Sequence, residues 1–239
     1  MSHVFLVRHA QASFLEPDYD KLSPTGETQA HLLGEYWASR NIAFDSIYTG
    51  PRVRQIDTAK IVAGIYRRLG VAFPEPVAMV EFDEYQWEDV LRNSIPKLVE
   101  TDAEMRGLHG AFQSAVAPEE KRSTFQRMFE GVVGKWVDGE LVLPDVESWP
   151  EFCARVNRGL SKLTSRGLRG EQVAVFSSGG PIGVAMQRAL NLSPRDTLRV
   201  TWMSRNCSYS EFLCSGERFT LSAFNATPHL DDPSLLTYR

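Results

Sequence analysis

Short apolar runs alternate with longer amphipathic segments along most of the chain. The runs predict strands at Val4–Val7, Asp45–Thr49, Val77–Val80 and Val173–Ser177, followed by two more near Ser208–Leu213 and Glu217–Phe224. Strands that alternate with helices in this way are typical of βαβ units, whose parallel strands are covered by helices on both faces. The pattern therefore predicts an α/β fold with three layers, α/β/α, around a mostly parallel central sheet.

The helices between these strands begin at recognisable signals. Ser23 is a suitable N-cap before Pro24 at the first helical position, and the apolar stripe that follows predicts a helix to about Arg40. Ser148 and Glu151 have the spacing of a capping box, which predicts the start of another helix. Further helices are predicted from Pro51 onward and over Ile182–Leu190.

Residues 86–147 differ in composition from the rest of the chain. One amphipathic stripe stands out among Gly, Pro and charged residues, and its members are Phe125, Met128, Phe129, Val132 and Trp136. The segment predicts a helical insertion, which we expect to form a lid on a single domain of residues 1–239. It holds seven basic and twelve acidic residues, so its net charge is −5 and that of the remaining chain is +1.

Composition narrows the classes of partner. A chain of 239 residues with a net charge of −4 lacks the basic excess of a nucleic-acid-binding protein. Cys153, Cys207 and Cys214 follow no metal-ligand spacing, which is typical of free thiols in a reducing compartment. No segment approaches the roughly 20 apolar residues of a membrane span. We expect a soluble cytoplasmic protein that binds neither nucleic acid nor membranes. Its oligomeric state stays open, with a dimer among the alternatives.

Chemically active residues follow three of the predicted strands. Arg8 and His9 come directly after the first strand, Glu81 follows the third, and Ser178-Gly179-Gly180 follows the fourth. Ligands of open α/β sheets bind outside the carboxyl ends of the strands, so these residues are expected to share one crevice. Each has an ordinary alternative: a hydrogen-bonded loop histidine, a solvated glutamate and a glycine turn. Together they supply an imidazole nucleophile, a guanidinium, a carboxylic acid and helix N-terminal amides, which suit transfer of a phosphoryl group to histidine.

The ordered motifs resemble those of the histidine phosphatase superfamily, which includes phosphoglycerate mutases and many phosphatases. Arg8–Ser13, which reads RHAQAS, resembles the RHG signature of that superfamily. The segment Tyr48–Ala59, with Arg54 four residues before Thr58, is similar to its second landmark. Further segments resemble later landmarks of the superfamily, in the same order. They are Glu81 with Trp87-Glu88, Glu147-Ser148, Gly179–Ile182, Asn206, Asn225 and His229-Leu230. The resemblance covers nearly the whole chain outside residues 86–147.

The resemblance implies a role for each of these residues. His9 would attack phosphorus and become a phosphohistidine, and Glu81 would protonate the departing oxygen, with burial beside the phosphate raising the pKa of its carboxyl. The catalytic set is therefore His9, Glu81, Arg8 and Arg54. The phosphate-binding set is Arg8, Arg54, Ser178, Gly179 and Ser13. Water would hydrolyse the phosphohistidine, and the reaction needs neither a metal ion nor a cofactor.

Two positions depart from the family pattern. Ala10 stands where the signature has glycine, and Ser178 stands where the superfamily has a second histidine that donates to the phosphoryl oxygens. A neutral hydroxyl forms a weaker bond than a charged donor. Ser178 as a nucleophile is disfavoured, because its surroundings are not a G-x-S-x-G elbow.

Three functions follow from this sequence in order of preference. The first is a phosphomonoesterase acting on a small phosphorylated substrate, with inorganic phosphate as product and activity weakened by Ser178. The second is a module of the same fold that binds a phosphorylated ligand without turnover. The third, a mutase, fits less well because the acidic insertion would disfavour doubly phosphorylated ligands.

Overall fold

The computed structural model describes residues 1–13, 20–165, 170–216 and 218–238. The chain divides into two compact units, one made of Met1–Glu84 with Arg155–Arg239 and the other of Tyr85–Ala154. The first unit contains a six-stranded sheet, and the second is helical. None of the helices that the structure describes combines the length and the apolar character that a membrane crossing requires.

The sheet of the first unit is mixed and mostly parallel. Its strands are β1 (Ser2–Arg8), β2 (Ser46–Thr49), β3 (Val77–Ala78), β4 (Gln172–Ser177), β5 (Tyr209–Ser215) and β6 (Arg218–Ala226). They lie in the order β3-β2-β4-β1-β5-β6, in which the first four are parallel, β5 is antiparallel to β1, and β6 is antiparallel to β5. The predicted α/β fold with a mostly parallel sheet is confirmed. The antiparallel strands β5 and β6 form one edge of the sheet.

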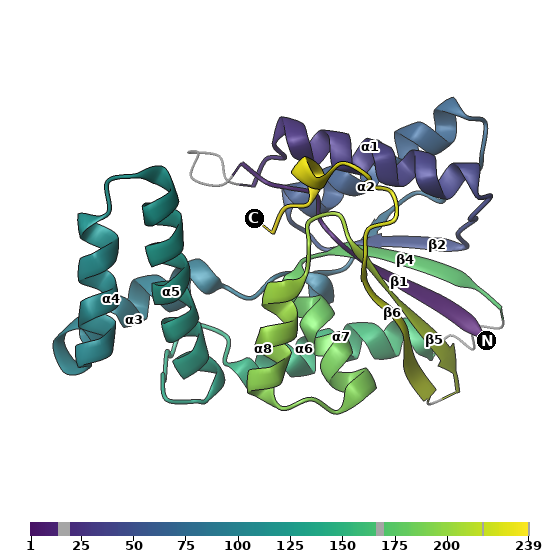
Figure 1. Ribbon diagram of the computed structural model, residues 1–239. Helices are drawn as coiled ribbons and strands as arrows, with labels where there is room; N and C mark the ends of the chain where they lie inside the picture. The colour runs from purple at the N-terminus through teal and green to yellow at the C-terminus, as the bar shows by residue number, and fades with distance from the viewer. Residues whose placement is uncertain (14–19, 166–169, 217, 239) are drawn as a thin grey trace. The chain divides into compact units, whose positions relative to one another are not determined.

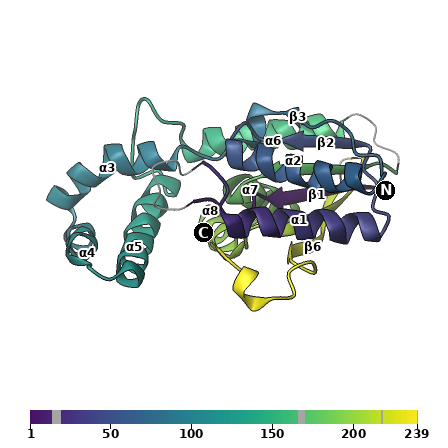
Figure 2. The same ribbon diagram turned by 90° about the horizontal axis from the view of Figure 1, so that it is seen from above.

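Helices cover both faces of this sheet (Figures 1 and 2). The helices α1 (Pro24–Ser39) and α2 (Val53–Arg68) lie on one face, and α7 (Gly179–Leu190) and α8 (Pro194–Met203) lie on the other with the end of α6 (Trp149–Thr164). Ser23 caps α1, because its Oγ accepts from the N–H of Gly26 at 3.0 Å. The strand β1 is buried nearly throughout, as expected of a central parallel strand.

The second unit contains three helices inside the expected insertion. They are α3 (Trp87–Thr101), α4 (Ala103–Ser114) and α5 (Pro118–Val137). Two aromatic clusters form its core, one with Trp136 stacked on Tyr85 at 5.2 Å between centroids and one with Trp87 against Phe129 at 5.8 Å. The aromatic residues of the insertion thus pack on one another. A role as lid stays a prediction.

Several boundaries differ from the expected ones. The third strand ends at Ala78, and Val80–Phe82 forms a 3-10 turn, η1, in its place. The helix α8 was not predicted from the sequence. Glu217, expected to begin the last strand, lies outside the described residues.

The contact between α7 and α8 gives a stability prediction. A Cβ added at Gly183 would lie 2.0 Å from Oγ1 of Thr201, which is buried and bonded to the carbonyl of Thr197. We expect Gly183→Ala to lower the free energy of unfolding by about 1–3 kcal/mol through overpacking. Gly64→Ala is the control, because nothing lies within 4 Å of a Cβ there. It should stabilise α2 by about 0.5–1 kcal/mol. Equal urea midpoints for the two variants would contradict this account.

Candidate active site

His9 lies just beyond the carboxyl end of β1 and is 5% exposed. Its Nδ1 is 2.8 Å from the carbonyl oxygen of Ala10, and the Nε of Arg54 is 3.2 Å from its Nε2. A carbonyl only accepts and a guanidinium only donates, so Nδ1 carries the proton and Nε2 the lone pair. The imidazole is therefore neutral, with Nε2 as its nucleophilic atom.

The surroundings of His9 favour this neutral form. Burial lowers the pKa of His9 well below its usual value, and the charges of Arg54 and Arg8 lower it further. The bond to the Ala10 carbonyl acts in the opposite direction but is the smallest of these effects. His9 is therefore unprotonated at neutral pH.

Arg54 is held at the start of α2 by a carboxylate. Its side chain is 3% exposed, and its Nη1 lies 2.7 Å from Oδ1 of Asp20. Asp20 also accepts from the N–H of Val53 at 2.8 Å, so it caps α2. Thr58, one turn along the helix, accepts from the N–H of Ala10 at 3.0 Å. These bonds fix α2 against the end of β1 and bring Arg54 to His9.

Arg8 is tied to the C-terminal part of the chain. Its Nη1 donates to the carbonyl of Ser204 and its Nη2 to the carbonyl of Tyr238, the second at 2.8 Å. The C-terminal segment is itself fixed, since Asn206 donates its N–H to Thr237 at 2.8 Å and Gln29 donates to Leu235 at 2.7 Å. A Cβ added at Gly179 would lie 4.0 Å from the Nε of Arg8, which places this guanidinium beside the start of α7.

Ser178 lies between β4 and α7 and is fully buried. Its Oγ accepts from Nε2 of Gln55 at 2.7 Å. The N–H of His9 donates to the carbonyl of Ser177 at 2.8 Å, so the ends of β1 and β4 meet here. Gln55 was not predicted as a site residue. Its position on α2, one residue beyond Arg54, is the only signal that the sequence offered for it.

A side chain that the sequence did not predict as part of the site binds the N-terminus of α7. Oε2 of Glu84 accepts from the N–H of Gly180 at 3.2 Å. A helix N-terminus favours negative charge, because its amides point outward and the helix dipole is positive there. The side chain of Ser178 makes no capping bond. Glu84 thus caps α7 at the place where the sequence predicted a phosphate.

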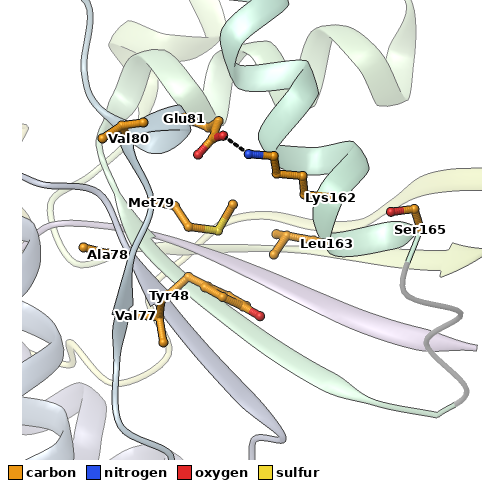
Figure 3. A pocket seen from close by; sticks show the side chains of 9 residues that line it. All are labelled: Tyr48, Val77, Ala78, Met79, Val80, Glu81, Lys162, Leu163 and Ser165. Carbon is orange, nitrogen blue, oxygen red and sulfur yellow. Dashed lines mark hydrogen bonds and ion pairs between the residues drawn. The ribbon is translucent and has the colours of Figure 1, made fainter.

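Glu81 occupies different surroundings. Its carboxylate pairs with Nζ of Lys162 on α6, at the edge of a pocket of about 540 Å³ lined also by Met79, Leu163 and Tyr48 (Figure 3). The hydrogen bond from Lys162 lowers the pKa of the Glu81 carboxyl. This direction is opposite to the one expected of a proton donor. The structure therefore brings Arg8, His9, Arg54 and Ser178 together but joins Glu81 to Lys162.

Ser13 lies in the loop beyond His9 and is buried. Its N–H donates to the carbonyl of Lys21 at 2.9 Å, next to a bridge between Ala12 and Leu22. This pairing fixes the backbone of the loop. A phosphate-binding role for Ser13 stays a prediction. Among the described residues, no group of three or more His, Cys, Asp or Glu side chains is arranged to hold a metal ion.

Several solved structures share this fold, and phosphatases are among them. The chain is 19% identical to a phosphoserine phosphatase from Entamoeba histolytica solved with 3-phosphoglyceric acid, with 96% of this chain and 100% of that chain covered and a TM-score of 0.63. It is 16% identical to the alpha-ribazole phosphatase of Shigella flexneri, with 94% and 96% covered and a TM-score of 0.62. These identities show the fold alone.

The sequence matches a family model over most of its length. No curated protein matches it. The model of the histidine phosphatase superfamily (branch 1) matches residues 4–134 and 118–227, which together span most of the chain. The match includes His9 after β1, Arg54 at the start of α2 and Ser178 after β4. The chain belongs to the histidine phosphatase superfamily, branch 1.

Proposed function

We propose that this protein is a phosphomonoesterase that acts on a small phosphate monoester through a phosphohistidine at His9. The observation that carries the proposal is the pairing around the imidazole: Nδ1 faces a carbonyl and Nε2 faces the guanidinium of Arg54. This arrangement supports a neutral imidazole as nucleophile, with the guanidinium cation of Arg54 next to the attacking Nε2. Such a pairing suits a phosphoryl group, whose oxygens the guanidinium binds while Nε2 approaches phosphorus.

The covalent step forms a bond between Nε2 of His9 and phosphorus and breaks the ester bond. The electron pair of that bond leaves with the ester oxygen, while Nδ1 keeps its proton and donates it in a hydrogen bond to the Ala10 carbonyl. Arg54 and Arg8 offset the negative charge of the phosphoryl oxygens. Water then attacks phosphorus, and the electron pair of the P–N bond returns to Nε2 as phosphate leaves.

Ser178 supports a second candidate function. In our proposal it stands in place of the second histidine of the superfamily, and its Oγ already accepts from Gln55. Its O–H is then directed toward another acceptor, so it offers one neutral hydrogen bond to a phosphoryl oxygen. A charged donor is roughly twice as strong. With serine in place of this histidine, we expect either slow turnover or binding of a phosphorylated ligand without turnover.

The substrate that we propose carries one phosphoryl group. The similar phosphatase of Entamoeba histolytica was solved with phosphoserine and with 3-phosphoglyceric acid, both small. Residues 86–147 hold seven basic and twelve acidic residues, so this segment is negatively charged. Negative charge slows the encounter with polyanions, which favours substrates with a single phosphoryl group. A screen in which sugar bisphosphates react faster than monophosphates would contradict this preference.

Trapping the phosphoenzyme tests the proposed function. The protein is mixed with an aryl phosphate labelled at phosphorus and quenched in alkali within the first turnover. We expect label that is stable to alkali, is released by acid and maps to the peptide containing His9. Label on serine, which is stable to acid, would contradict the proposal. Retained phosphate binding without label or turnover would favour the binding module.

A further inference from the structure

Two glutamates follow the short strand β3, and they lie in different surroundings. We propose that Glu84, rather than Glu81, is the carboxyl group that gives the proton to the departing oxygen and takes one back from water. This inference rests on the proposed function at His9. It assigns the acid–base role by position in the structure, whereas the spacing of the sequence motif points to Glu81.

Glu81 is held as an anion away from the start of α7. Its carboxylate pairs with Lys162, and its side chain packs against α6, since a Cβ added at Gly159 would lie 2.7 Å from the Cβ of Glu81. An ion pair favours the charged form of a carboxyl group. A group that stays ionised in this way has no proton to donate.

Glu84 lies at the place where the strand ends meet. Its Oε2 accepts from the N–H of Gly180, two residues beyond the buried Ser178. The preceding residue, Ser177, accepts from the N–H of His9. Arg8 lies at the same helix start, beside Gly179. The Glu84 carboxylate is therefore at the end of the sheet that carries the nucleophile and one of the predicted phosphate ligands.

The backbone explains why two glutamates three residues apart separate. Glu81 belongs to the 3-10 turn Val80–Phe82, whereas Asp83 is extended, with φ −67° and ψ 150°. Phe82 is fully buried, and its carbonyl accepts from Oγ of Ser177 at 2.8 Å. The chain therefore crosses the end of β4 between the two glutamates. Glu81 is left beside α6, and Glu84 is carried to α7.

The charged groups around Glu84 favour its protonation when a phosphoryl group is bound. Asp83 pairs with Arg52 at 2.6 Å, and Arg155 donates to the carbonyls of Val80, Glu81 and Asp83. Arg8 lies beside Gly179, at the same helix start as Glu84, and Arg54 lies at His9 and is paired with Asp20. A phosphoryl group that binds Arg8 brings negative charge beside the Glu84 carboxylate, and like charges at short distance favour protonation of one of them.

The proton balance of the two steps is then complete. In the first step, the Glu84 carboxyl gives its proton to the ester oxygen as the P–O bond breaks. In the second step, the Glu84 carboxylate takes a proton from the water that attacks phosphorus, and the P–N bond to His9 breaks. Glu84 ends in its starting form.

Leaving groups of different basicity test this role. Glu84→Gln keeps an oxygen that accepts from Gly180, and Glu81→Gln is the matched control. Each is assayed with an alkyl phosphate, which needs a proton donor, and with p-nitrophenyl phosphate, which needs one far less. For Glu84→Gln we expect kcat/KM to fall by about 100-fold or more with the alkyl ester but less than about 10-fold with the aryl ester. It should also release one equivalent of nitrophenol in a burst, because hydrolysis of the phosphoenzyme slows.

The outcomes separate the two proposals. A leaving-group effect in Glu81→Gln and none in Glu84→Gln would overturn the assignment. An equal loss with both substrates in Glu84→Gln would also overturn it, since that result indicates a structural role at the N-terminus of α7. A wild-type protein that forms no phosphoenzyme and releases no phosphate from either ester would overturn the proposed function, and this role with it.

Discussion

Replacing His9 by Ala is expected to abolish turnover of every phosphate monoester, with kcat lowered by about 10⁴-fold or more. The reason is that Nε2 is the atom that accepts the phosphoryl group, and the buried site offers no second imidazole in contact with Arg54 among the described residues. Water could then attack only directly. Release of phosphate in the steady state and labelling by an aryl phosphate both measure the loss.

The same substitution elsewhere gives the control for His9→Ala. His31 lies on the exposed side of α1, where its Nδ1 contacts the carbonyl of Glu27 at 2.7 Å. His31→Ala should leave kcat within about 2-fold, because surface substitutions of this kind change little. Turnover that survives in His9→Ala at more than a few per cent would exclude the phosphohistidine route.

Replacing Arg54 by Met should lower kcat/KM by about 100- to 1000-fold, the usual effect of losing one preorganised charged donor. Methionine fills a similar volume, so the buried position stays packed. The variant loses the bond to Nε2 of His9 and the charge that offsets the phosphoryl oxygens. Inhibition by inorganic phosphate should weaken in parallel, which a competition assay measures.

The pH profile of Arg54→Met should change in a defined direction. Burial lowers the pKa of His9 most, followed by the charge of Arg54. Protonated His9 cannot attack, so the acidic limb of kcat/KM lies well below pH 6.5 in the wild type. Removing the charge raises the pKa of His9, and the limb should move upward toward pH 6.5.

Arg68→Met is the control for this variant, since Arg68 lies on the same helix, is 60% exposed and pairs with Glu35. Its pH profile should match that of the wild type. An acidic limb that moves downward in Arg54→Met, or that stays in place, would contradict the contact between Arg54 and His9.

The elements with strong local signals were predictable from the sequence. The apolar run Val4–Val7 lies inside β1, and Ser23 with Pro24 marks the start of α1 to the residue. Both signals act locally, through burial of continuous side chains and through one capping bond. The order of the strands was not predictable in this way, because it depends on pairing between residues far apart.

The edge of the sheet was less predictable. Val77–Val80 has the composition of a strand, but only Val77 and Ala78 pair with β2, and both are exposed. An edge position provides one neighbour instead of two, so the strand ends early. The helix α8 has an N-cap at Ser193 followed by Pro194, a signal of the same kind as that of α1.

The residues of the candidate site also differ in how far the sequence predicts them. His9, Arg54 and Ser178 were predicted because each stands beside a strand end or within a recognisable motif. Asp20 and Glu84 were not predicted, because their positions depend on contacts across 34 and 96 residues of chain. Glu81 has the motif spacing, but the turn η1 directs it to Lys162. Spacing locates a segment, and backbone geometry decides which of its side chains reaches the site.

The bond from Arg8 to the carbonyl of Tyr238 joins residues 230 positions apart. Translation proceeds from the N-terminus, so the strand that carries Arg8 leaves the ribosome long before Tyr238 does. The guanidinium can adopt this position only after Tyr238 has been made. Because β1 also pairs with β4 and β5, a nascent chain can form the anion site only after these strands and Tyr238 have left the ribosome, and phosphate binding marks that point.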